Sequence, residues 1–176
     1  MQKGRRLQNA NVLLIIGTTI GIVLSFTTYI GVETTANAAF CGSCHTMRPF
    51  VASYGLVVHG GNNPFGFRAR CTDCHLPHDN LPHYLAAKAE TGLNDVWVES
   101  FGDAAKIDWA QKAKDPDRYV YDSGCLKCHG NLRRETLSNP RAFLPHRAYF
   151  AGTTTRTCVD CHSNVGHKYL AEFIRK

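Results

Sequence analysis

Eight cysteines and four histidines form a pattern that occurs four times along the chain. Each Cys-x-x-Cys pair is followed at once by a histidine, which gives four motifs at residues 41–45, 71–75, 125–129 and 158–162. Two thiols at this spacing can add to the two vinyl groups of one porphyrin, and the adjacent histidine then faces the iron. This is the attachment signature of haem c. The cysteines concerned are Cys41, Cys44, Cys71, Cys74, Cys125, Cys128, Cys158 and Cys161.

Other uses of paired cysteines fit this spacing less well. A zinc ribbon usually has ~15–20 residues between its two pairs, whereas 26, 50 and 29 residues separate the pairs here. A thiol–disulfide redox pair has no need of a histidine at the next position in all four cases. The sequence therefore predicts four covalently bound haem c groups. It also predicts an exported protein, because haem c is attached outside the bacterial cytoplasm.

Each haem iron has a second axial position, and five histidines outside the motifs could fill it. His59 and His146 each stand twelve residues before the first cysteine of a motif, in sequence able to fold back over a haem. His167 follows His162 by five residues and is expected to serve a neighbouring haem. These three histidines are the predicted distal ligands.

The other two histidines are weaker candidates. His78 lies one turn after His75 and points to the same side, so it is a poor distal ligand for that haem. His83 stands at a predicted helix start, where an exposed or capping role is the better interpretation.

The first motif differs from the others because Met47 follows His45 by two residues. Residues two apart can reach only one face of a haem, so His45 and Met47 are alternatives for that face. Met47 could also be a packing residue. Three distal candidates for four haems leave one iron short of a ligand, and we expect this to be the first.

The segment before the first motif is typical of a membrane anchor. Residues 7–32 carry no charge, and residues 12–32 would span ~31 Å as a helix, close to the thickness of a bilayer's hydrocarbon. Lys3, Arg5 and Arg6 precede it, which predicts a cytoplasmic N-terminus. A signal peptide cleaved after Ala36-Asn37-Ala38 is the alternative, with an unusually long apolar region. Cys41 follows Val32 by nine residues, at most ~30 Å of chain, so the first haem should lie near the membrane.

The rest of the chain is expected to be mainly α and irregular. Residues 82–115 favour one or two helices, with Gly92 and Gly102 as candidate break points. Residues 60–70 have the composition of turns, and no alternating strand pattern is present. The predicted architecture is an N-terminal anchor, residues 1–34, and a small multihaem cytochrome c domain, residues 35–176, in which the haems form the core.

Charge says little about partners. The chain has 20 Lys and Arg against 14 Asp and Glu, but no basic run is interleaved with aromatic residues, so nucleic-acid binding is not expected.

Several segments together resemble a known family. FCGSCHTM, CTDCHLPHD, KAETGLNDVW and TCVDCHSNVGH, after an apolar N-terminal segment, are similar in sequence and order to the NapC/NirT/NrfH family of membrane-anchored tetrahaem cytochromes c. The resemblance implies a single-pass protein of the bacterial inner membrane that oxidises quinol and feeds a periplasmic redox enzyme, with its haem domain in the periplasm. Electrons would enter at the first haem and leave at the fourth. The oligomeric state is left open.

The resemblance also implies roles for individual residues. Met47 would bind the first iron in place of His45, and Asp95 would lie over its open face. Lys88 and Asp95 would border the quinol pocket. Independently of the resemblance, they are seven apart and share a helix face, which could also be an ordinary solvated face. Beside a quinol, the Lys88 charge would hold Asp95 ionised as a base, or Lys88 would orient the quinol by a hydrogen bond. The other irons would each take the motif histidine and one distal histidine: His75 with His167, His129 with His59, and His162 with His146.

Within the family, an internal His146 for the fourth haem resembles the branch that serves nitrate reductases. In the branch that anchors nitrite reductase, the partner supplies a lysine. Two alternatives remain: reverse flow, as a quinone reductase fed by a periplasmic oxidation, and a plain electron-carrying subunit without a quinone site. A nitrite-reducing enzyme is not expected, because no Cys-x-x-Cys-Lys variant is present.

Overall fold

The structure is a computed structural model that describes residues 2–103 and 106–174. The chain divides into two compact units, the first ending at Asn37 and the second beginning at Ala38.

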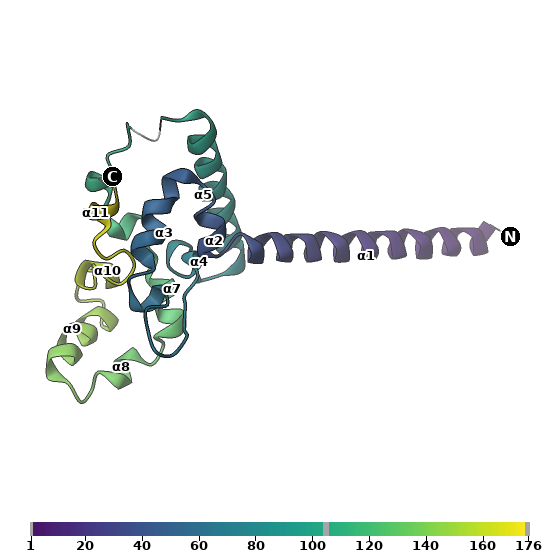
Figure 1. Cartoon of the computed structure of the whole chain (residues 1–176). Coiled ribbons are helices and arrows are strands. Elements are labelled where there is room, and N and C mark those ends of the chain that lie inside the picture. The colour runs from purple at the N-terminus through teal and green to yellow at the C-terminus, as the bar shows by residue number, and fades with distance from the viewer. Residues whose placement is uncertain (1, 104–105, 175–176) are drawn as a thin grey trace. The chain divides into compact units, whose positions relative to one another are not determined.

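The first unit is a single long helix, α1 (Gln2–Thr34), seen in Figure 1. Within the described residues it provides one span, Asn9–Thr34, that is long and apolar enough to cross a membrane. Its apolar side chains, from Val12 to Ile30, are exposed on every side. A helix that is apolar all round requires apolar surroundings, as the sequence predicted for this segment.

The second unit is built from short helices and irregular connections, and the described residues contain no strand. In chain order the helices are α2 (Ala38–Cys41), η1 (His45–Met47), α3 (Arg48–Tyr54), η2 (Val58–Gly60), α4 (Cys71–His75), α5 (Leu81–Phe101), α6 (Trp109–Lys112), η4 (Pro116–Arg118), α7 (Asp122–Cys128), α8 (Leu132–Glu135), α9 (Pro140–Phe150), α10 (Cys158–Cys161) and α11 (Leu170–Ile174). The prediction of a mainly helical and irregular fold is confirmed.

Helix α5 is the longest element of this unit. The Asn80 side chain caps its start by accepting a hydrogen bond from the His83 backbone N–H. The expected break at Gly92 was wrong, because α5 runs through that position. One glycine costs a helix only about 1 kcal/mol, which the surrounding Ala, Leu and Glu residues offset. Gly102 does end the helix, as its C-cap.

The second unit buries few of its own apolar side chains. Among the described residues from 38 on, those below about one tenth exposure are Tyr54, Val57, Ala69, Leu76, Ala87 and Val159, together with Pro77. A domain of this size normally buries a much larger apolar core. The elements are therefore arranged around something other than one another's side chains, which fits haem groups as the core.

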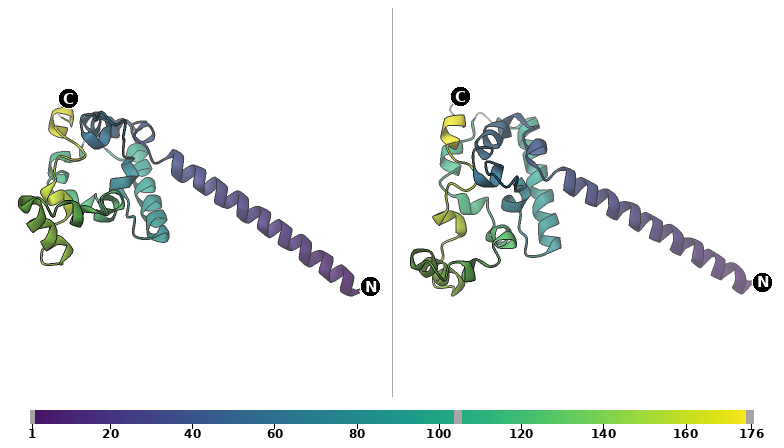
Figure 2. Two further views of the ribbon diagram at one scale, coloured as in Figure 1. Left: turned by 90° about the horizontal axis from the view of Figure 1, so that it is seen from below. Right: turned by 60° about the horizontal axis from the view of Figure 1, so that its bottom comes forward.

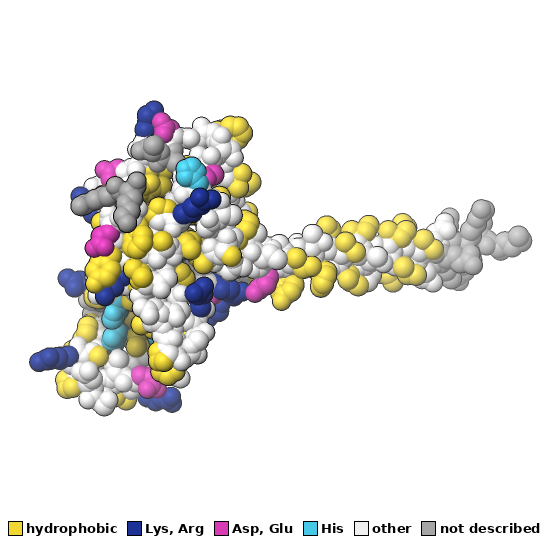
Figure 3. Space-filling model, in the orientation of Figure 1, with side chains coloured by type: hydrophobic (Ala, Val, Ile, Leu, Met, Phe, Trp, Pro, Cys, Tyr) yellow, Lys and Arg dark blue, Asp and Glu magenta, His cyan; other side chains and the backbone are white. Residues whose placement is uncertain are grey.

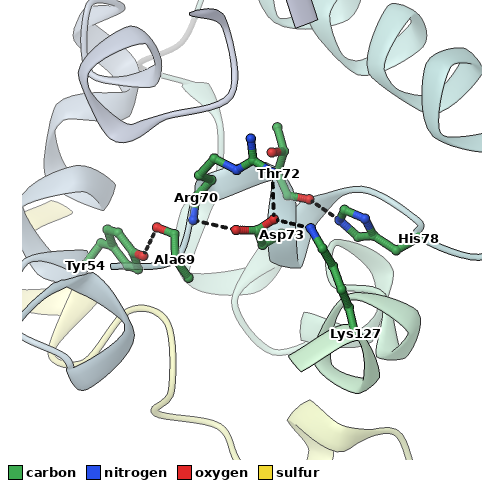
Figure 4. Close-up of polar contacts among 7 residues, drawn as sticks. All are labelled: Tyr54, Ala69, Arg70, Thr72, Asp73, His78 and Lys127. Atoms are coloured by element: carbon green, nitrogen blue, oxygen red, sulfur yellow. Dashed lines mark hydrogen bonds and ion pairs between the residues drawn. The ribbon is translucent and has the colours of Figure 1, made fainter. Parts of the chain in front are cut away.

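A polar joint connects α4 to α7 (Figure 4). The Asp73 carboxylate accepts a hydrogen bond from the Arg70 backbone N–H at 2.8 Å and pairs with Lys127 Nζ at 2.9 Å. Burial raises the pKa of Asp73, but these partners outweigh it and the net pKa is lowered. The Tyr121 backbone N–H donates to the Cys74 carbonyl at 3.0 Å. The second and third motifs are thus held side by side.

The second unit has two opposite sides. In all three views of Figures 1 and 2, α8 and α9 lie on the side away from α5. Helix α5 contacts the first motif through Glu99, and α9 carries His146 beside the fourth motif. The first and last motifs therefore belong to opposite sides of this unit.

A substitution at Gly124 tests how closely α4 and α7 pack against each other. A Cβ at this position would lie 2.0 Å from the Asp73 carbonyl oxygen, whereas a Cβ at Gly55 would meet nothing closer than 3.5 Å. We expect Gly124→Ala to force the two helices apart, to cost about 1–3 kcal/mol and to lower the melting temperature and the yield of haem-loaded protein. Gly55→Ala is the matched control and should behave as wild type. Equal melting temperatures for the two variants would contradict this packing.

Candidate functional site

Three of the four motif histidines lie beside a histidine from outside the motifs. The ring centroids are 6.1 Å apart in each of the three pairs, which are His75 with His167, His59 with His129, and His146 with His162. Two imidazoles that bind one metal ion from opposite sides, each through a bond of about 2 Å, have ring centres roughly 6 Å apart. The three pairs thus have the spacing that a shared iron requires.

Hydrogen bonds set the protonation of three of these six rings. Nδ1 lies 2.7 Å from the Tyr119 carbonyl oxygen in His75, 3.0 Å from that of Phe50 in His167, and 2.7 Å from that of Ala142 in His146. A carbonyl oxygen can only accept, so in each ring Nδ1 carries the proton and Nε2 keeps its lone pair. Metal-binding histidines are usually oriented in this way.

Two of the rings are also held neutral. Burial lowers the pKa of His75 despite the hydrogen bond to Tyr119. Burial, and then the neighbouring His75, lower the pKa of His167 to about 4. A neutral imidazole is the form that binds iron, so both rings are ready to act as ligands at neutral pH.

Short helices present the motif cysteines. In α4 and α10 the aspartate before the second cysteine accepts a hydrogen bond from the backbone N–H just before the helix: Asp73 from Arg70 at 2.8 Å, and Asp160 from Thr157 at 2.6 Å. These bonds stabilise the first turn of each helix, and the motif histidine follows at the helix end.

Cysteines of different motifs approach one another in two places. The Cys125 and Cys158 sulfur atoms lie within 4.8 Å of one another, and the Cys41 and Cys71 thiols also interact. Beside Cys125 and Cys158, the Asp122 carboxylate connects α7 to the fourth motif and to α9. One of its oxygens accepts a hydrogen bond from the Cys158 backbone N–H at 2.9 Å, and the other accepts one from the Tyr149 hydroxyl at 2.7 Å. Haems attached here would have neighbouring edges, first with second and third with fourth.

The first motif lacks a histidine pair within the described residues. The His45 side chain is 80% exposed, and its Nδ1 lies 3.6 Å from Glu99 Oε1. Glu99 also accepts from the His45 backbone N–H at 2.8 Å and from Thr46 Oγ1 at 2.5 Å. Met47, which ends η1, is half-buried. His45 thus contacts a carboxylate where the other motif histidines have a second imidazole, and Met47 remains the alternative ligand for the first iron.

Lys88 and Asp95 lie beside this first motif. The charges of both act on the Cys41 thiol, and the charge of Asp95 also acts on His75. The pKa of Asp95 is raised because the neighbouring chain removes water from its carboxyl group. This direction is opposite to the one expected from a nearby lysine alone, and a raised pKa suits a group that must accept and release a proton.

His78 and His83 have other partners. His78 Nε2 lies 3.0 Å from the Thr72 carbonyl oxygen (Figure 4), and His83 Nδ1 lies 2.9 Å from Asp79 Oδ1 at the start of α5. Both side chains stabilise local structure, in line with the weaker candidacy that the sequence gave them.

Comparisons with known proteins identify the family. A family model described as "NapC/NirT cytochrome c family, N-terminal region" matches residues 4–172. The chain belongs to this family. It is therefore an electron-transfer cytochrome with covalently bound haem c.

Individual relatives agree with this assignment. The tetraheme c-type cytochrome CymA of Shewanella oneidensis is 32% identical over 170 residues, covering 89% of this chain and 89% of CymA. NapC of Escherichia coli K12 is also 32% identical over 170 residues, covering 89% of this chain and 80% of NapC. TorC of Escherichia coli K12 is 29% identical over 171 residues, and the match covers only 41% of TorC.

A solved structure has the same fold. A chain in the crystal structure of the cytochrome c nitrite reductase NrfHA complex, bound to the inhibitor HQNO, is 29% identical with a TM-score of 0.57. The match covers 87% of this chain and 88% of that chain.

Sequence reasoning missed two residues that position the motifs. Glu99 lies 53 and 54 residues from its partners Thr46 and His45, and Asp122 lies 36 residues from Cys158. In the sequence, Glu99 could have been noticed only because it follows Asp95 by four residues and so shares its helix face.

Glu99 can be tested as the residue that keeps His45 away from the iron. Glu99→Ala removes the acceptor for two hydrogen bonds, so we expect His45 to replace Met47 and the potential of one haem to fall, since a thioether ligand favours the reduced iron. Potentiometric titration followed by haem absorbance measures this. Glu90→Ala, an exposed glutamate on the same helix, is the matched control. Adding His45→Ala should reverse the change; an unaltered potential in Glu99→Ala would refute the positioning role.

Proposed function

We propose that this chain takes electrons from quinol in a membrane and passes them to a periplasmic redox protein. The observation that carries the proposal is the asymmetry of the motifs. Three motif histidines each have a partner imidazole at 6.1 Å. The remaining motif histidine, His45 of the first motif, instead contacts Glu99, which lies on the same helix as Lys88 and Asp95. An incompletely ligated centre beside ionisable side chains suits an entry point for a substrate that releases protons with its electrons.

The chain has ligands for four haems. The eight cysteines would form the thioether bonds, and the three histidine pairs would bind three irons. Met47 would bind the first iron, with Asp95 over its open face. Each haem c, when bound, supplies a one-electron carrier. The name of the relative CymA, a tetraheme cytochrome, supports this count.

At the first haem, where electrons would enter, side chains of this protein would accept the protons that quinol releases. Oxidation of a quinol releases two electrons and two protons, so a base must stand at the quinol hydroxyl. Asp95 has a raised pKa, which brings it closer to neutral pH, where a group that alternates between base and acid works best. Lys88, seven residues earlier on the same face of α5, would orient the quinol or the carboxylate.

At the exit, the fourth iron would be complete within the chain. His146 and His162 form a pair, so no ligand from a partner is required. Helices α8 and α9 carry Arg133, Arg134, Arg141 and Arg147, which would attract an acidic partner. Such contacts are sensitive to salt and suit a transient partner. The match to a chain of the NrfHA complex supports an association with a reductase.

The chain would be anchored by α1, with residues 1–34 as cytoplasmic end and span and residues 35–176 as the periplasmic domain. Basic residues at positions 3, 5 and 6 precede the span, which favours this orientation by the positive-inside rule.

The decisive test of quinol oxidation compares two reductants in one preparation of the Asp95→Asn variant. The substitution keeps the shape and removes the basic oxygen. We expect reduction of the haems by quinol to slow by roughly 10²-fold or more, the usual scale for a positioned acid–base group, while reduction by dithionite is unchanged. Glu90→Gln is the control on the same helix. Normal rates with both reductants would make Asp95 a surface charge, and slow rates with both would make its role structural.

His146→Ala tests whether the fourth iron is completed by the chain itself. We expect the isolated wild-type protein to show a low-spin fourth haem and the variant a high-spin one, because the ligand opposite His162 is lost. Absorbance and electron paramagnetic resonance distinguish the two states. His83→Ala, which removes an exposed histidine paired with Asp79, should leave the spectrum unchanged. An open fourth haem already in the wild type would indicate a ligand supplied by a partner.

A further inference from the structure

Helix α5 carries an exposed apolar stripe that the proposed quinol site does not use. Leu93, Trp97 and Phe101 are 73%, 65% and 75% exposed, and the rings of Trp97 and Phe101 pack together with centroids 4.9 Å apart. The three residues are spaced by four and therefore lie on one helix face. Val96, 60% exposed, flanks them. Figure 3 shows hydrophobic side chains exposed along the edge of the second unit where α5 runs in Figure 1.

The residues of the first motif do not cover this stripe. At roughly 100° per residue, Lys88, Asp95 and Glu99 point in nearly the same direction, and Leu93 and Trp97 point roughly 140–180° away from it. Glu99 is bonded to the first motif, and the charges of Lys88 and Asp95 act on Cys41. The first motif thus lies against one face of α5, and the apolar stripe occupies the opposite face.

We propose that the α5 stripe, Leu93, Trp97 and Phe101, lies in the surface layer of the lipid bilayer. Chain length places it within range: Cys41 follows Thr34, the end of the apolar span, by seven residues, at most ~25 Å of extended chain. Helix α5 is joined to the same motif through His45 and Thr46. The short connection therefore limits how far the first motif, and the helix bonded to it, can lie from the end of the span.

The chemistry of the stripe also favours lipid over a protein partner. It contains no ionisable side chain, and it presents a tryptophan and a phenylalanine together, as helices that lie in the interface of a membrane do. The charged residues of the same half of α5, Asp95 and Glu99, lie on the other face. An interfacial position would leave the first motif on the opposite side of α5 from the lipid, one helix diameter (~10 Å) from it.

Photo-crosslinking in native membranes tests this placement without any measurement of activity. Benzoylphenylalanine is introduced in place of Leu93 or Trp97 in the full haem-loaded chain, and the adducts are identified by mass. We expect lipid adducts at both positions, at least about fivefold more abundant than at Leu137. Leu137 is the matched control, because it is 61% exposed and lies next to α8 on the other side of the unit.

Each other outcome overturns the proposal in a distinct way. Adducts with a second copy of this chain or with another protein would make the stripe a protein interface. Adducts within the chain or with haem would show that the stripe is covered from inside. No adduct above the Leu137 level would mean that it faces water. Since the readout is lipid contact, loss of quinol oxidation in the Asp95→Asn test neither supports nor overturns it.

Discussion

The spacing of three imidazole pairs is the constraint on which the rest of this structure depends. Each pair stands at 6.1 Å, which suits one shared iron, and two of the pairs join parts of the chain that are far apart in sequence. His167 meets His75, 92 residues earlier, and His59 meets His129, 70 residues later. The second unit buries few apolar side chains of its own, so its short helices have little else to hold them in these positions. In the proposed ligand arrangement, iron ligation and thioether bonds would replace the hydrophobic core of an ordinary domain.

The first motif is the one that lacks such an imidazole pair among the described residues, and its contacts differ from those of the other three motifs. Glu99 contacts the His45 backbone N–H, the Thr46 hydroxyl and the His45 ring, so hydrogen bonds to a carboxylate hold the first motif on α5. In the proposed ligand arrangement, the first iron would have one side free for a substrate. The same helix would supply Lys88 and Asp95 to that side, and its apolar stripe lies on the opposite face. In this proposal one helix holds the first motif, supplies the ionisable groups beside it and presents an apolar face to the lipid.

How far the sequence predicted this arrangement depended on whether the signal was local. The motif cysteines and histidines, the apolar span and the end of α5 at Gly102 are each specified by neighbouring residues and could be read directly. The pairing of His59, His146 and His167 was expected from the family resemblance, because spacing alone does not say which haem a histidine serves. Glu99 and Asp122 could not be found, since their partners lie 36 to 54 residues away. Gly92 misled because a single glycine is too weak a breaker to end a strong helix.

Electron paramagnetic resonance of the fully oxidised protein, with the spins counted against total haem, tests the proposed iron ligands most directly. Three iron centres with two imidazole ligands should give low-spin ferric signals, and the first centre, with an open face, should give a high-spin signal. The predicted result is three low-spin irons and one high-spin iron for each chain. Four low-spin irons with paired imidazoles, or two or more high-spin irons in the isolated protein, would contradict the ligand arrangement on which the account rests.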